Sequence, residues 1–263
     1  MRVWRVGIIN DLHIPWHDPV CVTLALQIIK DSNCDEIVLN GDVLDMYTCN
    51  SHGPKNPDIQ ETFESEIAQG RDFFKMLRET FPDKKITFIF GNHEDRIERF
   101  IMKECPAFWN MVKLESMLNL EQLRINFLKY PEKYMLNRLL GVQHSPPSYG
   151  VNGARTSLMA KPGVSMVYAC SHREQHSTIN DAHGRTHYCY FGGWLGNSKD
   201  YIQNKIAYKW MKGHENWQNC MHIADIFDDE NFTVHPISFN NGYASWGNKH
   251  YHFEREQNEA KEN

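Results

Sequence analysis

The first ninety residues alternate short apolar segments with helical patterns, and this order restricts the fold more than any other feature of the chain. The segments 3–10 (VWRVGIIN), 36–40 (EIVLN) and 85–90 (KITFIF) have the length and apolar content of buried strands. Residues 17–32 and 58–80 carry apolar side chains at helical spacing and predict two amphipathic helices. Strands that alternate with helices indicate a parallel sheet with right-handed crossovers.

The second half of the chain follows a different pattern. Residues 96–122 are predicted to be helical with an interruption near Pro106, and short strand-like segments such as VSMVYACSH and CMHIADIF come after them. We expect these strands to form a second sheet that packs on the first. Because no repeat or linker divides the chain, we predict one domain over residues 1–250 and a polar C-terminal tail at 251–263.

The composition is that of one ordinary globular domain. The chain has 263 residues, of which 41% are hydrophobic and 23% charged, and its formal net charge is −5. This length suits a single core, which can grow to roughly 250–300 residues. The acidic balance argues against an extended basic surface for duplex nucleic acid.

The chain shows no sign of a membrane or secreted protein. No segment approaches the roughly 18 apolar residues of a membrane span, and no charged leader precedes an apolar stretch at the start. The seven cysteines are odd in number and scattered, which is typical of reduced thiols. We therefore expect a cytoplasmic protein, in the host cytoplasm if the chain is viral, with no membrane partner.

Polar motifs follow the three predicted strands of the first half. The first strand leads into DLH (11–13), the second ends in NGD (40–42), and the third runs into GNHE (91–94). Because parallel strands end at the same edge of a sheet, we expect these side chains to meet there. Carboxylates and imidazoles suit divalent transition-metal ions. One carboxylate can bridge two ions roughly 3.5–4 Å apart, and such a pair clamps a phosphate and makes hydroxide available near neutral pH.

These motifs resemble those of the calcineurin-like metallophosphoesterase superfamily. The matching residues are Asp11-x-His13, Gly41-Asp42-x-x-Asp45, Gly91-Asn92-His93-Glu94-x-Arg96, His144 and the stretch 170–172. The segments LNGDVLDMY and FGNHEDRIERF are similar to small members from bacteriophage and prokaryotes. The resemblance implies a four-layer α/β/β/α sandwich of two mixed sheets flanked by helices. It also implies two divalent transition-metal ions (manganese, zinc, iron or nickel).

The resemblance implies a role for each ligand residue. Asp11 and His13 would bind one ion, and Asp42 would bridge both ions. Asn92 would bind the second ion, and His144, which follows a strand, is the best candidate to complete it.

Three further residues of these motifs are assigned to substrate or support. His93 would contact the phosphate together with Asn92 and act as the general acid for the leaving oxygen. Arg96 either holds a phosphate oxygen or forms an ion pair on the helix surface with Glu94 or Glu98. Asp45 is expected to orient the loop or a ligand histidine, without binding metal itself.

The last motif departs from the family pattern, which usually ends in Gly-His-x-His. Residues 167–173 read VYACSHR, and one alignment places Cys170 and His172 at the two histidine positions. A second alignment places His172 and Glu174 there, and we favour the first. A thiolate binds zinc or iron, so Cys170 and His172 are predicted ligands, although a cysteine at a strand end is also commonly a small buried apolar residue.

The sequence therefore predicts a dinuclear metal-dependent phosphoesterase in which a metal-bound hydroxide attacks the ester. The chain lacks an evident capping domain or peptide-docking region, which favours a phosphodiester or nucleotide substrate, such as a nucleic-acid end, over a phosphomonoester of a phosphoprotein. A binding module that kept the fold and lost the chemistry is the alternative of another class. Cys170 favours that alternative, and the six other family ligand and acid positions oppose it.

Overall fold

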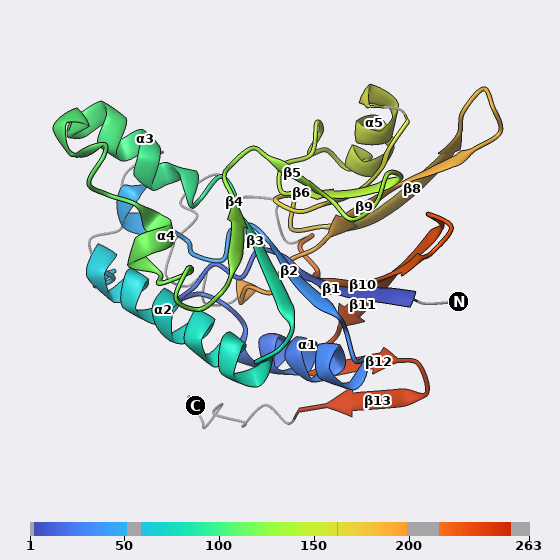
Figure 1. The fold of residues 1–263 in the computed structure, drawn as a ribbon, viewed down its shortest axis with the longest axis horizontal. Helices are drawn as coiled ribbons and strands as arrows, with labels where there is room; N and C mark the ends of the chain where they lie inside the picture. The colour runs from blue at the N-terminus through green and yellow to red at the C-terminus, as the bar shows by residue number, and fades with distance from the viewer. Residues whose placement is uncertain (1–2, 52–58, 162, 199–215, 254–263) are drawn as a thin grey trace, which may run out of the picture.

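The computed structural model describes residues 3–51, 59–161, 163–198 and 216–253. Figure 1 shows four layers, from α5 at the top through two sheets to α1 and α2 at the bottom. The predicted α/β/β/α sandwich of two mixed sheets is confirmed.

The first sheet has six strands in the order β11-β10-β1-β2-β3-β4. Its strands are β1 (Val3–Ile9), β2 (Glu36–Asn40), β3 (Lys85–Ile89), β4 (Asn126–Leu128), β10 (Asn219–Phe227) and β11 (Phe232–Phe239). Strands β1 to β4 are parallel, as predicted, whereas β10 is antiparallel to both β1 and β11. The expectation that the late segment CMHIADIF belongs to the second sheet is wrong. Its apolar pattern identifies a buried strand but carries no information about the strand beside it.

The second sheet has five strands in the order β5-β6-β7-β9-β8. Its strands are β5 (Lys133–Met135), β6 (Leu140–Gln143), β7 (Ser165–Tyr168), β8 (Glu174–Asn180) and β9 (Thr186–Gly192). The central strands β6, β7 and β9 are parallel, and β5 and β8 are antiparallel to their neighbours. The carboxyl ends of β6 and β7 carry His144 and the 170–172 stretch.

Two of the helices begin where a side chain caps them. In α1 (Pro19–Asp31) the Asp18 carboxylate accepts hydrogen bonds from two backbone amides. In α2 (Phe63–Thr80) Thr62 accepts from the Ser65 amide at 3.1 Å, so residues 59–62 are not helical, in contrast to the predicted start at 58.

The remaining elements lie in the connections between strands or near the end of the chain. They are η1 (Tyr47–Cys49), α3 (Asp95–Glu104), η2 (Pro106–Phe108), α4 (Leu114–Met117), α5 (Gly153–Ala160), β12 (Tyr243–Trp246) and β13 (Lys249–His252). The break between α3 and η2 confirms the interruption predicted near Pro106. The predicted start of the polar tail falls within β13, and residues 254–263 lie outside the described residues.

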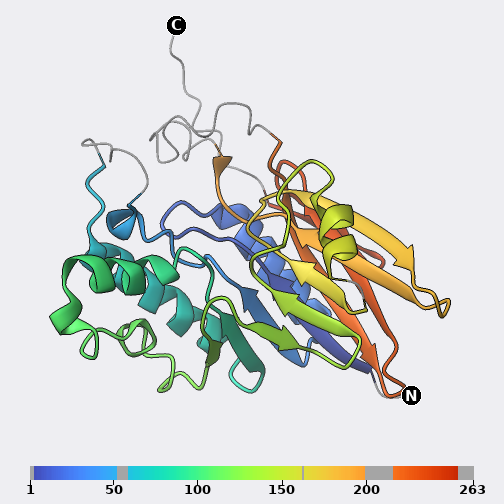
Figure 2. The ribbon, with the colours of Figure 1, turned by 90° about the horizontal axis from the view of Figure 1, so that it is seen from above.

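Three apolar clusters fill the three spaces between the four layers. Ile28 of α1 and Phe74 of α2 pack on the first sheet, and Val38 and Val142 meet between the sheets. Leu158 of α5 packs with other apolar residues on the outer face of the second sheet. Figure 2 looks down through these layers, with α5 in front of the second sheet. Among the described residues, no helix has the length and apolar character needed to cross a membrane.

Candidate metal centre

The loops after β1 and β2 are joined by backbone hydrogen bonds that bring their polar residues together. The Asp11 amide donates to the Gly41 carbonyl at 3.1 Å, and the His13 amide donates to the Asp42 carbonyl at 2.9 Å. Both loops therefore present their side chains to one side, at the carboxyl edge of the parallel strands.

Five of the predicted ligand residues have a left-handed backbone. Their φ angles are 47° at Asp11, 54° at His13, 49° at Asp42, 62° at Cys170 and 55° at His172. Positive φ is uncommon for residues other than glycine, and such strained positions concentrate at functional sites. These five are among the eleven described residues other than glycine that have a positive φ.

Two glycines of the motifs leave room for the side chains of this site. A Cβ on Gly41, where φ is +82°, would lie 2.3 Å from Nδ1 of His144. A Cβ on Gly91 would lie 2.1 Å from Oδ1 of Asp42. Both positions therefore require glycine, because a methyl group would displace a predicted ligand.

The first donor cluster consists of Asp11, His13, Asp42 and His172, all buried, with ligand atoms within 4.8 Å of one another. Nε2 of His13 lies 3.0 Å from Nε2 of His172, which lies 3.3 Å from Oδ1 of Asp11. Nδ1 of His13 pairs with Oδ2 of Asp45 at 3.0 Å, which leaves the lone pair of Nε2 facing the cluster. Two imidazole nitrogens and two carboxylates that converge in this way suit a divalent transition metal.

The second donor cluster consists of Asp42, His144 and Cys170, again within 4.8 Å of one another. Oδ1 of Asn92 joins it, at 3.0 Å from Nε2 of His144 and 2.9 Å from Sγ of Cys170. Nδ1 of His144 donates to the Asn40 carbonyl at 2.8 Å, so Nε2 faces Oδ2 of Asp42 at 3.2 Å. Asp42 belongs to both clusters, which is the position of a bridging carboxylate.

The structure also distinguishes the two alignments of the last motif. Cys170 lies in the second cluster and His172 in the first. Glu174 lies in β8, where its carboxylate accepts a hydrogen bond from Ser238 Oγ at 2.6 Å. This geometry agrees with the alignment that places Cys170 and His172 at the two histidine positions.

His93 and Arg96 lie beside the shared carboxylate. The His93 amide donates to Oδ1 of Asp42 at 2.8 Å, and its ring Nδ1 pairs with the Asp45 carbonyl at 2.7 Å. Arg96 donates from Nη2 to Nε2 of His93 and from Nη1 to the Asp45 carbonyl, both at 2.7 Å. Among the described residues, Arg96 therefore contacts His93 and Asp45. The expected alternative, an ion pair on the helix surface with Glu94 or Glu98, does not form.

Charges within the clusters compensate one another. Burial alone would raise the pKa of Asp42, but His144 and His93 outweigh it and hold that pKa well below its usual value. Burial would lower the pKa of His144, but Asp42 and Cys170 raise it well above its usual value. Burial, with the Asp42 charge acting in the same direction, raises the pKa of Asp11 to about 7. These carboxylates repel one another, so a bound cation would stabilise them.

The pKa of the Cys170 thiol and the pKa of His93, the predicted acid, shift in opposite directions. Burial raises the pKa of Cys170 despite the opposing effect of His144, so the thiol keeps its proton until a metal displaces it. Burial, reinforced by Arg96, lowers the pKa of His93 well below its usual value. The His93 ring is therefore neutral, and its Nδ1–H donates a hydrogen bond to the Asp45 carbonyl.

Glu94 is a supporting residue whose role the sequence does not reveal. Its Oε2 accepts hydrogen bonds from the amides of Asp42 at 2.9 Å and Gly91 at 2.7 Å, and Oε1 accepts from Leu44 at 2.9 Å. Burial, with the Asp42 charge, raises its pKa to about 7. Glu94 thereby joins the second and third motif loops, and its position directly after His93 is the only sequence signal for this role.

A cavity of about 560 Å³ opens above the clusters. Its lining includes Asp42, Asn50, Asn92, His93, Arg96, Tyr149, Cys170, Ser171, His172, Arg173 and Trp217. Tyr149, which is about half exposed, and Trp217, whose ring lies 4.2 Å from that of His172, are wall residues that the motifs do not predict.

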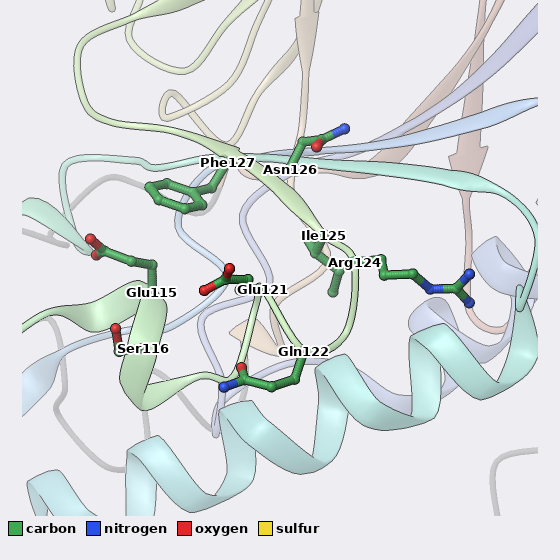
Figure 3. Close-up of a pocket in the computed structure, with 8 residues that line it drawn as sticks. All are labelled: Glu115, Ser116, Glu121, Gln122, Arg124, Ile125, Asn126 and Phe127. Carbon is green, nitrogen blue, oxygen red and sulfur yellow. The ribbon is translucent and has the colours of Figure 1, made fainter.

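A second cavity, of about 650 Å³, lies elsewhere, between α4 and β4. Figure 3 shows the carboxylates of Glu115 and Glu121 near Phe127, with Arg124 directed away from them. It contains none of the donor groups of the two clusters, so the smaller cavity is the candidate active site.

The residues present fit two divalent ions. The first cluster offers two imidazoles and two carboxylates, and the second offers a carboxylate, an imidazole, an amide oxygen and a thiol. Nitrogen and oxygen donors of this kind suit zinc, iron, manganese or nickel, and the thiol adds a preference for softer ions.

Comparison with known proteins agrees with this chemistry. A family model described as calcineurin-like phosphoesterase matches residues 5–259. No curated protein matches the chain.

Several solved structures are similar to the chain at low identity. Vacuolar protein sorting 29 from Cryptosporidium parvum is 10% identical, with a TM-score of 0.48 over 95% of this chain and 99% of that one. The phosphoesterase Yfce from E. coli is 14% identical, with a TM-score of 0.40 over 90% of this chain and 100% of that one. A dimetal phosphatase from Danio rerio is 9% identical, with a TM-score of 0.37 over 89% of this chain and 95% of that one.

Proposed function

The chain belongs to the calcineurin-like phosphoesterase family, and from this premise we propose that it is a dinuclear metal-dependent phosphoesterase acting on a phosphodiester or nucleotide. One observation carries the proposal. The buried Asp42 carboxylate is shared by two donor clusters that otherwise have no ligand in common. Such an arrangement suits two ions bridged by one carboxylate.

Each cluster would hold one ion. Asp11, His13 and His172 would bind the first ion, and Asn92, His144 and Cys170 would bind the second, with Asp42 between them. When bound, two such ions supply a hydroxide nucleophile near neutral pH and neutralise charge on the phosphate. The left-handed backbone and the buried hydrogen bonds of these residues hold the donors in place beforehand.

His93 is proposed to protonate the leaving oxygen. Its Nδ1 is held by the Asp45 carbonyl, so Nε2 is the nitrogen that faces Arg96 in the cavity. A phosphate that binds to Arg96 would draw the guanidinium away from Nε2, and its negative charge opposes the effects that lower the pKa of His93. The ring could then carry the proton that the leaving group needs.

The shape of the cavity supports a small ester as substrate. A volume of about 560 Å³ lies within the usual range for small-molecule sites. Tyr149 and Trp217 offer aromatic surface beside the phosphate position, which suits a nucleobase or another flat group. This wall favours a nucleotide or a nucleic-acid end over the phosphorylated side chain of a protein.

The test is hydrolysis of two matched esters by protein reloaded with manganese. A nitrophenyl phosphate monoester and a bis-nitrophenyl diester are compared, with Asp42→Asn as the control for both. We expect the diester to be the better substrate and the control to lose activity by about 10³-fold or more, because both ions depend on that carboxylate. Turnover that survives in Asp42→Asn would sink the two-metal proposal.

The acid role has its own test. His93→Ala should retain two metal equivalents but lose about 10²–10⁴-fold on alkyl esters, whose leaving groups need a proton. Loss on nitrophenyl esters should be far smaller. Equal losses on both kinds of ester would remove His93 from the acid role.

A binding module that has lost catalysis stays the second candidate, since Cys170 replaces a histidine that the family usually has. Absence of turnover with manganese, zinc, iron and nickel, together with less than one bound ion per chain, would favour that candidate.

A further inference from the structure

Glu66 is a fully buried carboxyl group on the first turn of α2, outside the family motifs. It accepts a hydrogen bond from the Met46 amide. One turn later, a Cβ on Gly70 would lie only 2.7 Å from Cδ2 of Leu44, so the helix packs directly on the loop after β2. Figures 1 and 2 both show the start of α2 beside η1, which follows that loop.

The Asp45–Met46 peptide group is held on both sides. Its carbonyl accepts from Nδ1 of His93 and Nη1 of Arg96, both at 2.7 Å, and its N–H donates to Glu66. Because a peptide group is planar and its N–H and C=O point in opposite directions, fixing the N–H also fixes the carbonyl. Met46 has a φ of 50°, a conformation that needs support in a residue other than glycine.

The side chain of Asp45 serves a different histidine from its carbonyl. Its Oδ2 lies 3.0 Å from Nδ1 of His13 but 3.6 Å from Nδ1 of His93. The carbonyl is thus the closer partner of His93, and Glu66 acts on this carbonyl. A change at Glu66 should therefore reach His93 and leave the metal ligand His13 in place.

We propose that Glu66 is a positioning residue that sets the tautomer of His93. By holding the Met46 N–H, it keeps the Asp45 carbonyl aimed at Nδ1 of His93, so that the Nδ1 proton is fixed and Nε2 faces Arg96. A hydrogen bond to the N–H of a peptide also strengthens its carbonyl as an acceptor. The effect of Glu66 on catalysis rests on the proposed acid role of His93. Its effect on the His93 tautomer does not depend on that role.

The variants Glu66→Gln and Glu66→Leu test this inference, with Glu64→Leu on the same helix as an exposed control. Burial, with the Asp45 charge, raises the pKa of Glu66 well above its usual value, so a neutral amide is a close substitute that keeps an acceptor. We expect Glu66→Gln and the control to match the parent enzyme. Glu66→Leu should keep two bound manganese ions and lose about 10–100-fold on alkyl phosphoesters, with little change on nitrophenyl esters.

The second measurement does not depend on turnover. Nitrogen-15 NMR of labelled histidine reports which ring nitrogen of His93 carries the proton. The parent protein and Glu66→Gln should show the Nδ1–H form, and Glu66→Leu should show a mixture of the two tautomers. If the protein hydrolyses no ester and still shows this pattern, the proposed function is wrong and the positioning role of Glu66 is supported.

Two outcomes overturn the inference. One is an unchanged His93 tautomer in Glu66→Leu, and the other is an equal loss on both classes of ester accompanied by loss of metal, as expected for simple damage to the fold. If Glu66→Leu does not fold, Glu66→Asp takes its place, since the shorter side chain cannot reach the Met46 N–H in the same geometry. It should give the same discrimination between esters with a smaller loss, and an unchanged tautomer would again overturn the inference.

Discussion

Two buried histidines in different regions of the molecule have pKa values that shift in opposite directions. His144 lies at the candidate metal centre and His222 lies between the two sheets, and each is only 1% exposed. The pKa of His144 rises well above its usual value, because Asp42 and Cys170 outweigh the cost of burial. Burial lowers the pKa of His222 to about 3, with His176 acting in the same direction.

The two histidines differ in the groups that surround them. At the strand ends, buried polar groups face groups of opposite charge, and ring nitrogens converge on common points. Between the sheets, the His222 ring is a neutral part of the core, 5.9 Å from the ring of Tyr190. Burial of a histidine is common to both regions, so the arrangement of its neighbours is what marks the site.

The contrast continues within the metal centre. The first cluster holds only imidazoles and carboxylates, and its residues are all buried. The second cluster includes a thiol and an amide, and its cysteine is partly exposed to the cavity. We expect the two sites to differ in metal preference and in ease of exchange.

Among the substitutions that separate the two clusters, we expect the largest effect at Cys170, the residue that makes their donor sets different. Cys170→Ala should lower the affinity for the second ion by at least about 100-fold and reduce turnover by a similar factor. Cys170→His should keep two ions and shift the preference from zinc towards manganese, because imidazole is a harder donor than thiolate. Metal analysis after dialysis, followed by hydrolysis with each ion, measures both changes.

Cys189, which is buried and lies on the outer face of the second sheet, is the control. Cys189→Ala should leave metal content unchanged. If Cys170→Ala still binds two ions as tightly as the parent protein, Cys170 is no ligand and the two clusters differ less than their donors indicate.

The part of this centre that the sequence predicts is the part that lies directly at strand ends. Asp11, Asp42 and Asn92 follow successive parallel strands, so strand order alone brings them to one edge. His144 and Cys170 were placed through the family resemblance, and they come from the second sheet. All of these residues except the lone His144 lie within a recognisable motif.

Apart from the contact of Asp45 with His13, which agrees with the role expected for Asp45, the supporting contacts were not predictable, because they join residues far apart in the sequence without a pattern. Glu66 lies on a helix whose apolar spacing gives no reason to expect a buried carboxyl group that reaches Met46. Arg96 bonds to a backbone carbonyl, which any residue could have supplied. The partner of β10 was also missed, since a strand buried on both faces fits either sheet.

A smaller effect should follow from Asp45→Asn, which alters support for the first cluster alone. Burial would raise the pKa of Asp45, but its hydrogen bond with His13 and the charge of His93 hold it well below its usual value. Loss of that negative charge should weaken binding of the first ion by about 10–100-fold. The His93 tautomer should persist, because its partner is the Asp45 carbonyl. A manganese titration and nitrogen-15 NMR test the two statements, and a loss confined to the second ion would contradict the assignment.

His222→Leu tests the region between the two sheets, and we expect no effect of this variant on turnover. A histidine with an unfolded pKa near 6.5 and a folded pKa of about 3 gives stability that is present above pH 6.5 and is lost as the pH falls towards 3. The unfolded chain binds the extra proton in this window, so the free energy of unfolding falls by up to about 1.4 kcal/mol per pH unit. Leucine cannot bind that proton. From pH 7 to pH 5, the free energy of unfolding of the variant should therefore gain about 2 kcal/mol relative to that of the parent protein.

Urea denaturation at both pH values measures the difference, with His183→Leu at an exposed position as the control. Parallel stability curves for His222→Leu and the parent protein would show that the ring is not held neutral, and that the contrast between the two regions is weaker than their structures indicate.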